Sequence, residues 1–136
     1  MKINVKNIKL SDRSRLYLRH PGTQQFLLTA SGERMYIELY GAHSERYKSV
    51  MRKWQNEALK QRKIKVTAEQ SEQRGHELLA SITADWNLEG GDDQPIPLSM
   101  DAAMAIYSDP ENDWIRAQCD EHVFDQANYL GESFAA

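Results

Sequence analysis

The hydrophobic period of this chain changes at Gly41. Before that residue, apolar and polar residues alternate over residues 34–40, which is the period of a half-buried β-strand. After it, apolar residues recur at spacings of three and four, which is the period of an amphipathic α-helix. We therefore predict an α+β fold with a β-rich part over residues 1–40 and a helical part over residues 41–132.

Turn signals divide the β-rich part into strands. Residues 20–23, His-Pro-Gly-Thr, form one turn signal, and Ser31 with Gly32 forms another. The apolar run 26–30 lies between these two turns. Alternation also marks the segments 3–5 and 16–18. We expect these segments to form a small N-terminal antiparallel β-meander.

The helical part begins with a basic amphipathic helix over residues 45–65. Ser44 is a good N-cap for this helix, and Glu45 suits its first turn. Its apolar residues form one stripe at helical spacing: Tyr47, Val50, Met51, Trp54, Ala58 and Leu59. The other faces and the end of the helix are rich in lysine and arginine, and cations near a helix C-terminus suit the helix dipole.

Three more helices are predicted from their start signals, which gives about four α-helices in all. Thr67 opens a capping box, Ser99 caps a short helix, and Asp109 with Pro110 starts the last helix. The helix after Thr67 is expected to run to Gly90-Gly91, with Leu78, Leu79, Ile82 and Trp86 on one side. The last helix is expected to run toward Gly131, and residues 133–136 to form a flexible tail.

Size and composition are those of a single folded domain over residues 1–136. At this length a chain buries roughly two-thirds of its unfolded surface, and 40% of the residues are hydrophobic. Cys119 is the only cysteine, so no disulfide can form within the chain. We expect a reducing compartment and no membrane span, because no apolar run approaches the ~20 residues that a span requires.

Charge divides the chain into two opposed halves. Residues 1–66 contain 15 Lys and Arg against 5 Asp and Glu, whereas residues 67–136 contain 2 against 15. Such a division indicates either a basic region for nucleic acid or two complementary surfaces. The two halves could also dock within one monomer, and the sequence leaves this alternative open.

Reactive side chains form only weak constellations, so we expect no enzyme, no catalytic residue, no metal and no cofactor. Phosphate loops, dinucleotide glycine patterns and serine elbows are missing. Cys119 and His122 are three residues apart, but a closed zinc site needs about four ligands. We expect Cys119 in the core and His122 near the surface. The acids Asp92, Asp93 and Asp101 fit solvation and capping better than catalysis.

The basic helix over residues 45–65 makes a nucleic-acid-binding protein the alternative function. Its cations could neutralise several phosphates. Its aromatic residues, Tyr47 and Trp54, fall on the apolar stripe, and the acidic second half would repel a polyanion. We therefore expect no nucleic-acid partner and favour protein binding.

Self-association follows if the basic helix of one subunit faces acidic helices of the next. Such a head-to-tail contact produces rings or open spirals. The residues expected in this contact are Arg52, Lys53, Lys60, Arg62, Lys63 and Lys65 on the basic side and Asp113, Asp120, Glu121 and Asp125 on the acidic side.

The order of motifs from Leu78 to Glu132 resembles that of tail assembly chaperones of long-tailed bacteriophages, which have non-contractile tails. The segments that carry the resemblance are Trp86 to Gly90, an acidic loop, Pro95 to Ser99, Trp114 to Gln118, and Asp125 to Glu132. Upstream, residues 40–44 are similar to the family's strand-to-helix junction. The likeness covers roughly residues 35–132.

The resemblance implies a non-catalytic factor that assembles phage tails. Members of the family bind the tape measure protein, keep it soluble in the host cytoplasm, help recruit tail tube subunits and leave before the virion is mature. The residues that we expect to contact a partner are Trp86, Trp114, Gln118, Asn128 and Tyr129. The alternative is that the three aromatic residues belong to the core.

Overall fold

The computed structural model describes residues 8–61 and 67–130, and it confirms the α+β class. Three strands, β1 (Arg13–Tyr17), β2 (Tyr36–Tyr40) and β3 (Thr83–Trp86), form one antiparallel sheet. The helices are α1 (Glu45–Gln61), α2 (Ala68–Ser81), α3 (Met100–Ser108) and α4 (Asp113–Phe124), with short 3₁₀ helices η1 (Pro110–Asn112) and η2 (Gln126–Tyr129). The expected segment 3–5 and the expected tail 133–136 lie outside the described residues.

The third strand of the sheet, β3, consists of residues that the sequence pattern predicted to be helical. The strand order of the sheet is β1-β2-β3, with Leu16 opposite Ile37 and Ile37 opposite Trp86. The helix expected to reach Gly90 therefore ends at Ser81, and the part 41–132 is not wholly helical. Pairing with the free edge of β2 outweighs the helical spacing of the apolar residues, because it satisfies backbone groups that β2 would otherwise leave unpaired.

The side chain of Asn87 bonds the end of β3 to the backbone at the start of β2. The Asn87 side-chain oxygen accepts the Tyr36 backbone N–H at 2.7 Å, and its side-chain nitrogen donates to the Arg34 carbonyl at 2.9 Å. The apolar run 26–30, by contrast, makes only isolated bridges, Arg19 with Phe26 and Leu28 with Arg34. The predicted turns at 20–23 and 31–32 are both present, and Gly32 has the positive φ of 88° that its tight reversal requires.

Three of the four predicted helix starts are confirmed by their caps. The backbone N–H groups of Tyr47, Gln70 and Ala102 donate to the hydroxyls of Ser44, Thr67 and Ser99 respectively. The fourth predicted start, at Asp109, does not begin an α-helix.

At that last start, Asp109 caps η1 through the Glu111 N–H at 3.0 Å, and α4 begins only at Asp113. It also ends early, at Phe124, because the Asp125 carboxylate caps the Ala127 N–H at 3.1 Å and opens η2.

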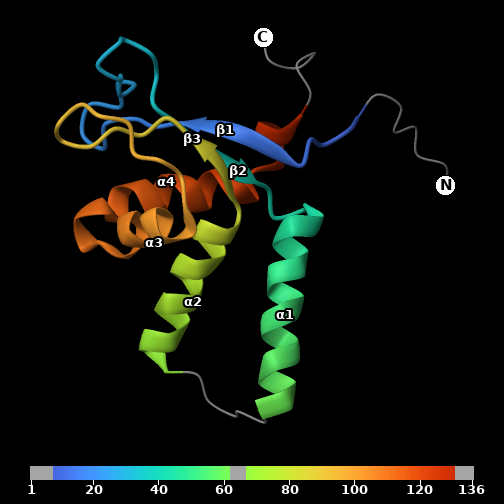
Figure 1. Cartoon of the computed structure of the whole chain (residues 1–136). Coiled ribbons are helices and arrows are strands. Elements are labelled where there is room, and N and C mark those ends of the chain that lie inside the picture. The colour runs from blue at the N-terminus through green and yellow to red at the C-terminus, as the bar shows by residue number, and fades with distance from the viewer. Residues whose placement is uncertain (1–7, 62–66, 131–136) are drawn as a thin grey trace.

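The core lies between one face of the sheet and helices α2, α3 and α4 (Figure 1). Leu18, Ile37 and Leu39 are at most 1% exposed on this face. Tyr107 of α3 is fully buried, and its hydroxyl lies 2.8 Å from the Thr83 hydroxyl of β3. Helix α1 meets the end of α4 at its first turn, and beyond that turn it projects away from the sheet (Figure 1). No helix among the described residues is long and apolar enough to cross a membrane.

Candidate protein-binding surfaces

Helix α1 carries an apolar stripe that the body of the protein leaves partly uncovered. Tyr47 packs against the core and meets the Phe124 ring edge-on, with centroids 6.0 Å apart. Beyond it, the α1 stripe consists of Val50, Met51, Trp54, Ala58 and Leu59. Four of these side chains are half-buried, and Leu59 is 77% exposed. A stripe of this kind in a globular protein is normally covered, so α1 is a candidate partner-binding element.

The cations of α1 lie on its exposed faces. Arg52, Lys53 and Lys60, all expected in self-association, line one shallow pocket together with Ser49, Asn56 and the acidic Glu57. Arg52 also pairs with Glu45 on the same helix. The other three expected cations, Arg62, Lys63 and Lys65, lie outside the described residues.

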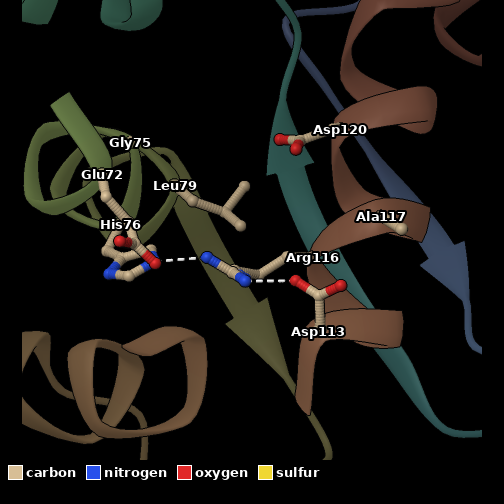
Figure 2. A pocket seen from close by; sticks show the side chains of 8 residues that line it. All are labelled: Glu72, Gly75, His76, Leu79, Asp113, Arg116, Ala117 and Asp120. Atoms are coloured by element: carbon tan, nitrogen blue, oxygen red, sulfur yellow. Dashed lines mark hydrogen bonds and ion pairs between the residues drawn. The ribbon is translucent and has the colours of Figure 1, made fainter. Parts of the chain in front are cut away.

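The acidic residues expected in self-association are divided between two sides of α4. Asp113 and Asp120 line a pocket of about 350 Å³ between α2 and α4, together with Glu72 (Figure 2). Glu121 and Asp125 line a larger groove of about 560 Å³ between β1 and α4. The acidic side is thus two surfaces, each open to a different direction of approach.

An arginine links the two helices that form the pocket of Figure 2. The Arg116 guanidinium of α4 donates to His76 Nε2 of α2 and pairs with Asp113. Burial raises the pKa of Asp120, Arg116 opposes this effect, and Asp113 adds to it. No spacing in the sequence predicts this cluster, although Arg116 is one of only two Lys or Arg residues in the acidic half.

The groove between β1 and α4 gathers five of the predicted residues: Trp114, Gln118, Glu121, Asp125 and Asn128. The side-chain amides of Gln118 and Asn128 form hydrogen bonds within the protein. The Arg19 N–H donates to the Gln118 side chain at 3.0 Å, and that side chain donates back to the Arg19 carbonyl at 2.7 Å. The Asn128 side chain donates to the His122 carbonyl at 3.1 Å. Trp114 is half-buried against the core and lines this groove together with Tyr17, which is 39% exposed, so both aromatic residues could meet a partner.

Two expected partner contacts are instead core residues, which corrects the sequence analysis. Trp86 is 6% exposed, and its indole N–H donates to the Ile96 carbonyl at 2.7 Å. Tyr129 is fully buried between the rings of His43 and His122. Neither side chain offers a surface to a partner in this conformation, as the alternative reading of the aromatic residues expected.

The reactive residues of α4 are buried as well. Cys119 is fully buried, as expected, and burial raises the pKa of its thiol. His122 is only 8% exposed, which corrects the expectation that it lies near the surface, and its Nε2 is 2.7 Å from the Ser14 hydroxyl of β1. Among residues 8–61 and 67–130, no three His, Cys, Asp or Glu side chains gather as a metal site requires.

The buried His122 is expected to make stability fall in acid. Burial lowers the pKa of His122 from 6.5 to about 4, and Asp125 partly opposes this shift. Between these two pH values the unfolded chain takes up a proton that the folded chain does not, so the free energy of unfolding decreases as the pH falls. Allowing for solvent screening, we expect a loss of about 2 kcal/mol from this group.

Urea unfolding of the native protein and of His122→Gln at pH 7 and pH 4 measures this contribution. The carboxylates titrate in both proteins. The difference between the two proteins in how the free energy of unfolding changes with pH therefore isolates the contribution of His122. Identical pH dependence in the two proteins would contradict the assignment.

Compared with models of protein families, with curated proteins and with solved structures, the chain matches none.

Proposed function

We propose that this chain is a non-catalytic protein-binding factor, a tail assembly chaperone of a long-tailed bacteriophage. In this proposal it binds the tape measure protein, keeps it soluble in the host cytoplasm, helps recruit tail tube subunits and is not part of the mature virion. The observation that carries the proposal is the α1 stripe, which remains partly uncovered on a projecting helix. The family named in this proposal is the one that the ordered motifs between Leu78 and Glu132 resemble.

The chemistry of α1 suits a helical client. An amphipathic helix recognises a partner by laying apolar anchors at helical spacing against a matching apolar face. Trp54 and Met51 are the anchors of the α1 stripe, since large, adaptable side chains contribute most at such contacts. The flanking Lys53 and Arg52 favour a client whose own flanks are acidic.

Coexpression with the tape measure protein tests the proposal directly. We expect the soluble fraction of the tape measure protein to rise and the two proteins to copurify. A tape measure protein that stays insoluble and never copurifies would sink the proposal.

Self-association between the cations of α1 and the carboxylates of α4 forms part of the same proposal. A head-to-tail homo-oligomer, a ring or a spiral, would place Arg52 and Lys53 of one subunit against Asp113 and Asp120 of the next. We expect the mass measured by light scattering to grow with protein concentration and to fall with added salt. Arg52→Glu with Lys53→Glu should reduce the mass without unfolding the protein, because both side chains are exposed.

The matched control reverses two exposed cations elsewhere, Lys9→Glu with Arg34→Glu. Equal loss of mass in both double variants would show a general charge effect and not the proposed contact. A monomer at every concentration would remove self-association from the proposal and leave client binding to be judged by coexpression.

A further inference from the structure

The sheet has a second face, on the side opposite the core, and this face is built from arginine and aromatic side chains. Alternate residues of the first strand and its extension, Arg13, Arg15, Tyr17 and Arg19, are exposed, whereas Leu18 is buried on the core side. The helices of the described chain lie on the core side of the sheet (Figure 1). The strand β1 therefore presents its polar side chains to the solvent.

Six side chains form what we call the arginine-aromatic face: Arg15, Tyr17, Arg19, Phe26, Arg34 and Tyr36. Tyr17 meets Phe26 and Tyr36 edge-on, with ring centroids 6.5 and 6.3 Å apart. The Arg15 guanidinium lies 4.0 Å from the centre of the Tyr36 ring. The Phe26 ring carries two guanidiniums, Arg34 at 4.0 Å and Arg19 at 4.5 Å. The three cations thus lie on two rings, Tyr36 and Phe26, and Tyr17 contacts both of these rings.

The acids near this face leave much of its positive charge available. Glu38 forms ion pairs with two arginines, 3.7 Å from Arg13 Nε and 3.8 Å from Arg15 Nε, so this single carboxylate offsets only one of their two charges. Asp85 is already used, because its carboxylate accepts hydrogen bonds from the Tyr36 hydroxyl at 3.1 Å and from the Trp86 N–H at 2.9 Å. Glu121 and Asp125 of α4 line the groove between β1 and α4 together with Tyr17 and Arg19, so they oppose part of the charge of Arg19. Arg15 and Arg34 do not line that groove.

We propose that the arginine-aromatic face binds single-stranded nucleic acid. Unpaired bases stack on exposed rings and on guanidinium planes, and arginine edges pair with phosphates, which together hold a single strand without reading its sequence. A duplex would offer this flat face only its phosphates. The inference concerns a surface separate from the α1 stripe and is independent of the client binding proposed above.

From the sequence, the basic helix over residues 45–65 is the candidate for binding nucleic acid, whereas the structure favours the arginine-aromatic face. The aromatic residues of α1 point along its apolar stripe, away from its exposed cations. On the sheet, each of Arg15, Arg19 and Arg34 stacks on a ring. Binding at α1 and binding at the arginine-aromatic face predict opposite effects on affinity when the same number of charges is removed from each surface.

Fluorescence anisotropy with a labelled oligothymidylate of about 20 nucleotides, at salt concentrations from low to physiological, tests the proposal. We expect Arg15→Gln with Arg34→Gln to weaken binding about tenfold or more. This double change should also reduce the slope of log affinity against log salt by about 1.4, because each lost contact to a single strand accounts for about 0.7. Arg46→Gln with Lys48→Gln on the exposed part of α1 removes the same charge without touching the proposed subunit contact and should leave binding nearly unchanged.

A second pair of variants tests stacking separately from charge. Tyr36→Phe keeps the ring under Arg15 and should keep affinity, whereas Tyr36→Ala should lower it several-fold. Thermal melts establish that each variant is folded. The proposal is overturned if the native protein does not bind at low salt, if both double variants lose affinity equally, or if only the α1 variant loses it.

Discussion

Met51→Glu with Trp54→Glu is expected to abolish copurification with the tape measure protein while leaving the chain folded. Both side chains belong to the half-buried α1 stripe, beyond the point where Tyr47 packs against the core. Anchors of this type typically contribute 2 kcal/mol or more each, so placing two carboxylates in the contact should weaken binding by more than about 100-fold. Glutamate is a good helix former, so α1 itself should persist.

The control for this change keeps the same helix and the same added charge. Gln55→Glu with Asn56→Glu alters two exposed positions that directly follow Trp54 in α1. We expect this variant to copurify with the client as the native protein does, with both variants showing native far-UV circular dichroism. Equal binding by the stripe variant and the control variant would contradict the role of the α1 stripe, even if coexpression itself succeeds.

Trp86→Ala is expected to destabilise the protein by about 3–5 kcal/mol, enough to unfold a large fraction of a marginal domain. The change removes a large side chain that is 6% exposed and pairs with Ile37 of the central strand. It also leaves the Ile96 carbonyl without the indole N–H that binds it at 2.7 Å. Urea unfolding followed by circular dichroism measures the loss.

Two further variants separate the causes of this loss of stability. One distinguishes packing from hydrogen bonding at Trp86, and the other compares this core tryptophan with a tryptophan on the α1 stripe. Trp86→Phe keeps much of the buried ring and should cost less, about 1–3 kcal/mol, chiefly for the unpaired carbonyl and the lost volume. Trp54→Ala on the uncovered stripe should change the free energy of unfolding by less than about 1 kcal/mol. A Trp86→Ala protein of native stability would reinstate Trp86 as a surface anchor.

The parts of the fold that the sequence predicted are those with local causes. The caps at Ser44, Thr67 and Ser99 depend on a side chain three residues from the N–H that it accepts, so the spacing alone identifies them. The alternation through Ile37 and Leu39 identifies a strand for the same reason. The alternating charges and rings of β1 were present in the sequence too, but nothing in their spacing says which rings will meet which guanidiniums.

The parts that the sequence did not predict depend on partners far along the chain. Trp86 sits at helical spacing from Ile82 and Leu79, and only the free edge of β2 makes it a strand residue. Gln118 has the character of an exposed contact residue until the Arg19 backbone, 99 positions away, occupies its amide. The charge division indicated two surfaces, but it could not indicate that the acidic residues would face two directions around α4.

The contact that joins Ser14 of β1 to His122 of α4 spans 108 positions of the chain. Contacts of such high sequence separation form late, because their loop-closure entropy must be overcome before they stabilise anything. During synthesis, β1 and the apolar face of β2 therefore emerge well before α4 can cover them. A newly made copy exposes apolar strand surface throughout that interval, and such surface favours aggregation. The factor that we propose to keep another protein soluble depends, for its own solubility, on how quickly its last helix is completed.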